Sequence, residues 1–193
     1  MKKRLLALMM ASAMVFAGSL AVYAEETEVE TEAAEATVLN WADFEEQINA
    51  SEETKAAYAG DFVEMEEIAM KIYVPDKFEQ VELTDEDTEA GYIAYFTLGD
   101  DAAVAVQYID MDEMSLEEYQ EILASEYEIT SEFMTINDLP ALAYSYEEDG
   151  TETAVLAYAT EMGYILEISF APVNDEAFGS VALVMMGSVQ AAE

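Results

Sequence analysis

Four short segments of strand-forming residues follow one another in the C-terminal half of this chain, and they restrict the fold more than any other feature. The segments lie at residues 133–136, 141–146, 153–160 and 164–170. Turn-forming residues separate them, namely Asn137-Asp138-Leu139-Pro140, Glu148-Asp149-Gly150 and Glu161-Met162-Gly163. Because such short turns join antiparallel neighbours, the pattern predicts an antiparallel meander.

The last of these segments alternates in polarity. Large apolar residues occupy every second position from Tyr164 to Phe170, with Ile165, Glu167 and Ser169 between them. This period of two predicts a strand with one buried face.

Two regions upstream also have strand patterns. Residues 92–98 and 102–109 predict a hairpin, with Gly99-Asp100-Asp101 at its tip. Residues 62–74 are rich in apolar and β-branched types and predict one bent strand or two, closed by Pro75.

Helix signals lie between these strands. Ser115 and Glu118 form a capping box, which predicts a helix start. The apolar face of that helix is expected to consist of Leu116, Tyr119, Leu123 and Tyr127.

Two further helices are expected, together with a turn or short helical start between them. Asn40 can cap a short helix with Trp41, Phe44 and Ile48 on its apolar face. Residues 83–87 predict a turn or short helical start. A terminal helix begins at Asn174 or Asp175, and its inward residues are Phe178, Val181, Met185 and Val189.

Hairpins with helices set between them predict an α+β fold, an antiparallel sheet flanked by helices. Residues 39–193 contain no Pro/Gly/Ser-rich linker and no internal repeat, so they are expected to form a single domain.

The N-terminus has a different character. A basic start, Lys2-Lys3-Arg4, precedes an apolar run that ends at Ala24, which is the layout of a cleaved signal peptide over residues 1–24. An uncleaved N-terminal anchor is the alternative, and the absence of cysteine excludes a lipoprotein. Residues 25–38 are acidic and poor in large apolar types, which predicts a disordered spacer.

The charge composition excludes several classes of function. The chain has 43 acidic and 6 basic residues, with no His and no Cys, and its net charge is −37. After residue 24 it has no arginine and only three lysines. Binding to the nucleic-acid backbone, Cys/His zinc sites and thiol or histidine catalysis are therefore not expected. Once the leader is cleaved, we expect no membrane association either, because an anionic surface repels anionic lipid.

Carboxylates leave two chemical alternatives open. A small hydrolase could use a pair of them, although no spacing distinguishes one pair among so many. A calcium site is the other, since calcium prefers oxygen ligands. Neither acidic loop matches an EF-hand, so the candidates are a looser site at Asp85, Glu86 and Asp87 or at Asp100 and Asp101.

Several segments resemble a known group of proteins. They are IYVP at 72–75, LTDED at 83–87, GYIAYF at 91–96, SLEEY at 115–119, INDLPA at 136–141 and GYILEISFAP at 163–172. Together they resemble small secreted proteins from anaerobic Gram-positive bacteria, and the order of elements is similar to the PsbP-like fold. This resemblance implies an α/β/α sandwich and a non-catalytic role, with no catalytic residues to transfer.

The sequence therefore predicts a secreted, non-enzymatic binding or accessory module, located at the cell envelope or outside the cell. Its partner is expected to be a protein or an envelope component. No cofactor is expected, with calcium as the one exception left open; an acidic calcium-responsive module and a small carboxylate-dependent hydrolase are the alternatives.

Overall fold

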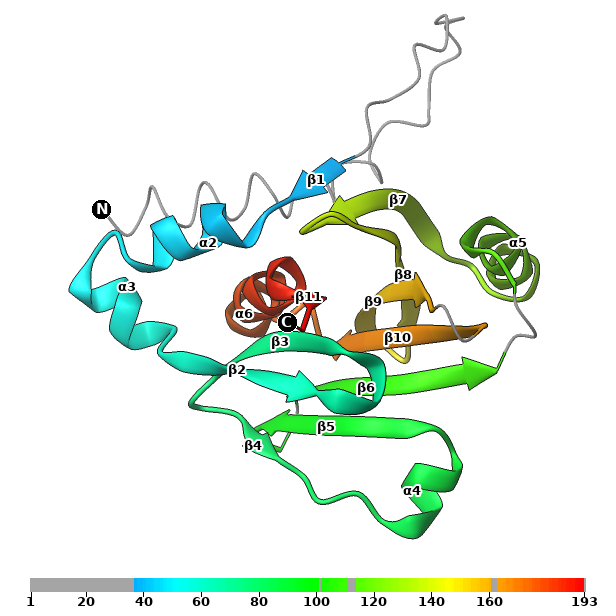
Figure 1. Ribbon diagram of the computed structural model, residues 1–193, viewed down its shortest axis with the longest axis horizontal. Helices are drawn as coiled ribbons and strands as arrows, with labels where there is room; N and C mark the ends of the chain where they lie inside the picture. Colours follow the sequence, from blue (N-terminus) through cyan, green and yellow to red (C-terminus); the bar gives the residue numbers. More distant parts are fainter. Residues whose placement is uncertain (1–36, 101, 111–113, 161–162, 193) are drawn as a thin grey trace, which may run out of the picture.

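A computed structural model describes residues 37–100, 102–110, 114–160 and 163–192 (Figure 1). The predicted signal peptide, residues 25–36 of the predicted spacer, and Asp101 lie outside these ranges. Strand β1 (Thr37–Leu39) pairs with residues 134–136, in the first strand of the predicted meander. Thr37 and Val38, which the sequence analysis assigned to the spacer, belong to this strand.

The eight strands of the larger sheet run in the order β1-β7-β8-β9-β10-β6-β5-β4. Beyond β1, their bounds are β7 (Thr130–Ile136), β8 (Leu139–Glu148), β9 (Thr151–Ala159), β10 (Tyr164–Ala171), β6 (Ala102–Asp110), β5 (Tyr92–Leu98) and β4 (Glu79–Gln80). The pairing of β1 with β7 is parallel, and the other pairings in this sheet are antiparallel. The predicted meander and hairpin are confirmed.

Two turns of the meander show why their residues were informative. Asn137 and Asp138 have φ angles of 46° and 68°, and Asp149 and Gly150 have 52° and 81°. Two successive positive φ angles match the twist of an antiparallel hairpin, and Asn, Asp and Gly tolerate that conformation best.

A second, smaller sheet has the order β11-β3-β2. Its strands are β2 (Gly60–Met65), β3 (Met70–Pro75) and β11 (Gln190–Ala191), and the 3-10 turn η1 (Glu66–Ile68) joins the first two. Residues 62–74 therefore form two strands, one of the two predicted alternatives. The separate sheet was not predicted, because a two-residue strand such as β11 leaves no periodic pattern.

The helices are α2 (Trp41–Ile48), α3 (Glu52–Ala57), α4 (Asp85–Glu89), α5 (Leu116–Glu126) and α6 (Glu176–Ser188). The capping box at Ser115 is confirmed, Thr84 and Asp87 form another at α4, and Asp175 caps α6. Helix α3 was missed, since none of its residues is buried and it has no apolar stripe.

The larger sheet is covered on both faces. The main core lies between one face, helix α6 and the smaller sheet, and a second core lies between the opposite face and α5. An α+β architecture with a sheet flanked by helices is thus confirmed. None of the described helices is long and apolar enough to span a membrane.

Two predictions about burial were wrong. Strand β10 is buried on both faces, because α5 covers the side that carries Ile165 and Glu167 (1% and 8% exposed). Tyr127 is 60% exposed rather than inward, because the chain turns extended at this residue, where α5 ends.

Tyr158 provides a test of the main core. Its side chain is 4% exposed and its hydroxyl has no hydrogen-bond partner among the described residues. A buried, unpaired hydroxyl costs free energy, so Tyr158→Phe is expected to raise the unfolding free energy by roughly 1 kcal/mol. Urea denaturation measures this change. The matched control is Tyr144→Phe, which removes a hydroxyl that donates to Glu167 and should lower stability. A loss of stability in both variants would show that the Tyr158 hydroxyl has a partner.

Candidate functional site

The acidic residues that the sequence proposed as two alternative calcium sites lie next to strand β5. Asp85, Glu86 and Asp87 lie in the first turn of α4, which precedes β5. Asp100 is exposed in the turn that follows β5, and Asp101 lies outside the described residues. A seven-residue strand spans about 20 Å, so Asp100 lies at the opposite end of β5 from the three residues of α4.

Asp87 already has local partners. Its carboxylate accepts hydrogen bonds from the backbone N–H and the hydroxyl of Thr84, at 2.8 and 2.7 Å. Both hydrogen bonds lower the pKa of Asp87, and the bond from the N–H has the larger effect. Within the described ranges, no group of three or more His, Cys, Asp or Glu residues is placed to hold a metal ion.

A groove between α2, α3 and the hairpin β2–β3 is the strongest candidate for a ligand site. Its volume is about 360 Å³, which lies in the range of small-ligand sites. The lining residues that matter for its chemistry are Trp41, Tyr73, Glu45, Asp61, Asp76 and Lys55.

Trp41 and Tyr73 supply the aromatic lining of this groove, here called its aromatic floor, and Phe62 packs against both rings. Trp41, Phe62 and Tyr73 contact one another, with ring centroids 4.9 to 5.5 Å apart. Phe62 and Tyr73 lie directly opposite each other on β2 and β3, and Trp41 is the first residue of α2. The Tyr73 hydroxyl is fixed by donating to the carbonyl of Tyr58 at 2.8 Å.

Helix α2 is held over these rings by its buried face. Phe44 and Ile48 pack against Leu183 and Val184 of α6. Gly187 permits this approach, since a Cβ at this position would lie 2.2 Å from the Phe44 ring. The predicted apolar face of α2 is therefore confirmed, with Trp41 half-buried at its edge.

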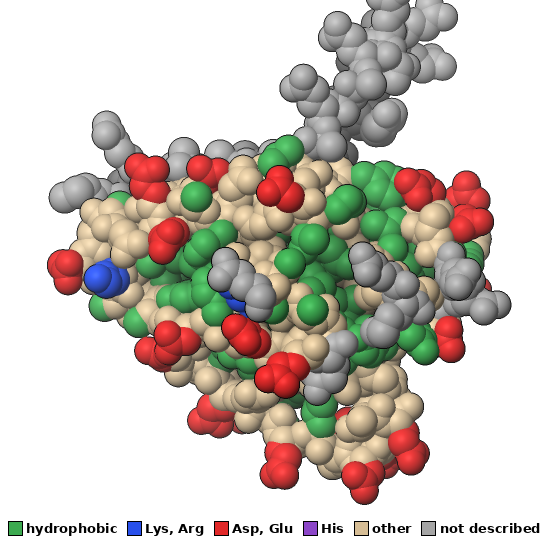
Figure 2. Space-filling model, in the orientation of Figure 1, with side chains coloured by type: hydrophobic (Ala, Val, Ile, Leu, Met, Phe, Trp, Pro, Cys, Tyr) green, Lys and Arg blue, Asp and Glu red, His purple; other side chains and the backbone are tan. Residues whose placement is uncertain are grey.

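The electrostatic character of the groove is acidic. Glu45, Asp61 and Asp76 are exposed on its rim, with Lys55 as the cation among the lining residues. Burial raises the pKa of the Tyr73 hydroxyl, and the charges of Asp76 and Asp61 raise it further. Figure 2 shows hydrophobic side chains gathered at the centre of this face, with red Asp and Glu side chains around them.

Two lysines near the groove lie over aromatic rings. The ammonium of Lys71 is 5.4 Å from the centre of the Phe62 ring, and that of Lys77 is 5.9 Å from the centre of the Tyr58 ring. Desolvation lowers the pKa of Lys77. Phe62 and Tyr58 do not line the groove themselves, but Phe62 packs against Trp41 and Tyr73, and the carbonyl of Tyr58 accepts the hydrogen bond of the Tyr73 hydroxyl.

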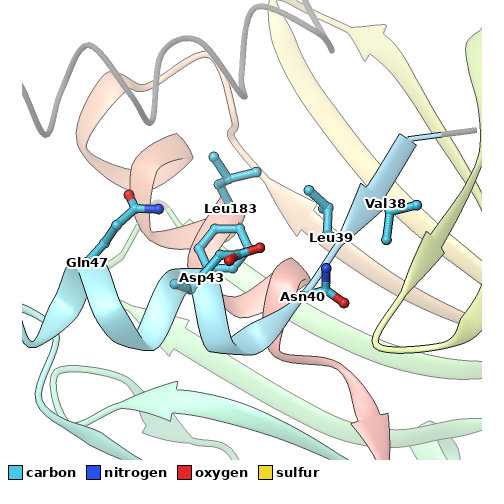
Figure 3. A pocket seen from close by; sticks show the side chains of 7 residues that line it. Val38, Leu39, Asn40, Asp43, Gln47 and Leu183 are labelled. Carbon is cyan, nitrogen blue, oxygen red and sulfur yellow. The ribbon is translucent and has the colours of Figure 1, made fainter.

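A second cavity beside α2 is smaller. It measures about 180 Å³ and lies between β1, α2 and α6 (Figure 3). Asp43 and Gln47 project from α2, and Leu183 closes the cavity from α6. This volume is below that of ordinary small-ligand sites, which favours the larger groove.

Glu167 is a buried polar residue that the sequence placed on an exposed face. Its Oε1 accepts hydrogen bonds from the hydroxyls of Tyr119, at 2.7 Å, and Tyr144. Desolvation raises the pKa of Glu167, and the two hydrogen bonds oppose that rise. Since α5 covers this carboxyl, the cluster fastens α5 to the sheet and does not open into either described cavity.

Comparisons with known proteins give similarity at the level of fold. No protein-family model matches the chain, and no curated protein matches it. Among solved structures, cyanobacterial PsbP (CyanoP) from Synechocystis sp. PCC 6803 is 13% identical, with a TM-score of 0.40, over 69% of this chain and 93% of that one. The resemblance noted in the sequence was to the PsbP-like fold.

Two other solved structures are similar to a comparable extent. LpqN, described as involved in cell envelope biogenesis of Mycobacterium tuberculosis, is 14% identical, with a TM-score of 0.43, over 70% of this chain and 86% of that one. A protein from Bacteroides thetaiotaomicron is 13% identical, with a TM-score of 0.39, over 65% of this chain but 46% of its own length.

Proposed function

We propose that this chain is an exported, non-enzymatic binding module that acts at the cell envelope or outside the cell. In this proposal, the groove between α2, α3 and the hairpin β2–β3 takes a cationic group of a protein or envelope component. The observation that carries the proposal is an aromatic floor inside an acidic rim, formed by Trp41 and Tyr73 with Glu45, Asp61 and Asp76.

The physical reason lies in the pairing of rings with carboxylates. An ammonium or guanidinium group over an aromatic face is attracted by the ring quadrupole, and carboxylates nearby add Coulomb attraction. Beside the groove, Lys71 and Lys77 make such contacts with the rings of Phe62 and Tyr58. A net charge of −37 also steers cationic partners towards the surface and repels nucleic acid and anionic lipid.

The hydrolase alternative fits the described residues less well. Glycoside hydrolysis needs two carboxyl groups that face each other across a substrate cleft. In this fold Glu45, Asp61 and Asp76 are exposed on the groove rim, and Glu167 is buried beneath α5 with two tyrosines. These positions favour attraction of a cation over acid–base chemistry.

The test is calorimetric titration with a blocked tetralysine peptide as the probe. Each of Asp61→Asn and Asp76→Asn is expected to weaken binding by roughly two- to fivefold, and Trp41→Ala by roughly tenfold. Glu121→Gln, an equal charge change on the exposed side of α5, is the matched control and should leave affinity unchanged. An equal loss in the control would mean diffuse attraction and would contradict a site in the groove.

The same titration separates the calcium alternative. Competition by CaCl₂ and by NaCl is compared at equal ionic strength, and equal weakening of tetralysine binding is expected from charge screening. Stronger competition by CaCl₂ would favour a calcium-responsive module instead.

A further inference from the structure

Strand β2 leaves one edge of the smaller sheet unpaired among the described residues. The hydrogen bond from the Asp76 N–H to the Ala59 carbonyl fixes which backbone groups face β3. Because that pattern alternates, Asp61, Val63 and Met65 direct their N–H and carbonyl groups towards β3. Gly60, Phe62 and Glu64 direct theirs outward, where another strand could pair with them.

The bond that Tyr73 makes supports this assignment. Phe62 pairs with Tyr73, so the Tyr73 N–H should point away from β2. It does so, donating to the Ser188 hydroxyl at 2.8 Å on the side of β11. The hydrogen bonds made by the N–H groups of Asp76 and Tyr73 therefore agree on which backbone groups of β2 face outward.

The side chains along this edge match a basic strand. Phe62 and Glu64 share the outer face of the smaller sheet with Tyr73 and Lys71, while Met65, Met70, Ile72 and Val74 fill the inner face. Gly60 and Asp61 also line the groove, so the edge and the groove are continuous. Natural edge strands are often guarded by lysine or proline, whereas β2 carries Asp61 and Glu64.

We propose that the partner presents an extended basic segment, which adds to β2 as a further strand and places a cationic side chain in the groove. This inference rests on the proposed function, since it uses the groove as the site for the cation. A second copy of this chain is a poor occupant, because two surfaces of net charge −37 repel and Asp61 and Glu64 would face acids.

The experiment uses a blocked heptapeptide in which lysine and threonine alternate, together with two backbone-methylated isomers. One isomer is N-methylated at every lysine and the other at every threonine. In a strand, alternate N–H groups face the same edge, so pairing with β2 requires only one of the two sets. We expect one isomer to lose at least roughly tenfold in affinity and the other to bind like the parent peptide, because several pairing bonds are lost together.

Amide hydrogen exchange gives a second readout. On binding of the parent peptide, the amides of Phe62 and Glu64 should become protected, while those of Asp61 and Val63, already bonded to β3, should change little. Equal affinity of both methylated isomers, or no alternation in protection, would overturn strand pairing.

The outcomes separate this inference from the proposed function. If the isomers bind equally but Asp61→Asn and Asp76→Asn still weaken binding, the groove holds a cation without strand addition. If those variants have no effect, the proposed function itself is wrong. Sedimentation at high NaCl tests whether a second copy of this chain occupies the edge of β2. A dimer that Glu64→Lys abolishes would assign the edge to that second copy and overturn the inference.

Discussion

Replacing Asn137 by alanine is expected to lower the unfolding free energy by about 3–5 kcal/mol. The side chain of this residue joins three parts of the fold that are far apart in sequence. Its Oδ1 accepts from the backbone N–H of Trp41 at 2.6 Å, and its Nδ2 donates to the carbonyls of Gly187 and Val189 at 2.9 and 2.8 Å. Alanine leaves all three backbone groups without this partner.

The location of these groups makes their loss costly. Trp41 begins α2, and Asn40, at the cap position of that helix, makes no side-chain capping bond. The amide of Asn137 therefore provides the cap from the β7–β8 turn. Gly187 and Val189 lie at the C-terminal end of α6, where helix carbonyls lack partners within the helix.

Three further variants separate the side chain from the backbone conformation. Asn137→Gly suits the φ angle of 46° but lacks the amide, so it should lose nearly as much as alanine. Asn137→Asp keeps the acceptor for Trp41 but sets a carboxylate against two carbonyls, and should also be strongly destabilised. Asp138→Gly is the control, because its φ is 68° and its side chain is exposed.

Chemical denaturation monitored by the fluorescence of the single tryptophan measures these changes, since Trp41 adjoins the affected cap. A loss below about 1 kcal/mol for Asn137→Ala would be an ordinary surface effect and would contradict the role assigned to the amide.

Asn137 also shows where sequence reasoning ends. Its turn was predictable, because Asn and Asp tolerate positive φ angles and follow a strand-like segment. The capping boxes at Ser115 and Thr84 are equally local, since both partners lie within four residues. The bond from Trp41 to Asn137 spans 96 positions, and no local pattern specifies it.

The same limit applies to the groove and to β10. The pairing of β2 with β3 places Phe62 beside Tyr73, and the packing of α2 on α6 brings Trp41 to both of them. In β10, the position of Glu167 in an alternating strand indicated that this residue lies on a solvent-exposed face. A carboxyl whose burial is compensated by tyrosine hydroxyls from α5 and β8 cannot be distinguished from an exposed one by its spacing.

Removing that carboxyl is the second change with a large expected effect. Glu167→Ala is expected to lower the unfolding free energy by about 3–5 kcal/mol, because two tyrosine hydroxyls lose their acceptor and a cavity opens beneath α5. Glu167→Gln keeps an oxygen that both hydroxyls can reach, so it should lose much less. Equal losses in the two variants would show that these hydrogen bonds do not determine the stability of the α5 interface.

The pH dependence of the stability difference between the wild type and Glu167→Gln tests the charge state of Glu167. Desolvation raises the pKa of Glu167 in the folded state, so the folded protein binds this proton more tightly than the unfolded chain does. The stabilisation from Glu167 is therefore complete below the unfolded pKa, about 4.3, and is lost as pH rises through the folded pKa. Glu167→Gln has no such proton, and subtracting its stability from that of the wild type cancels the shared repulsion among the surface carboxylates.

Urea denaturation across this pH range measures the unfolding free energy of both proteins. The advantage of the wild type over Glu167→Gln should shrink as pH rises. An advantage that grows with pH would mean that the tyrosine hydrogen bonds outweigh desolvation and lower the pKa instead.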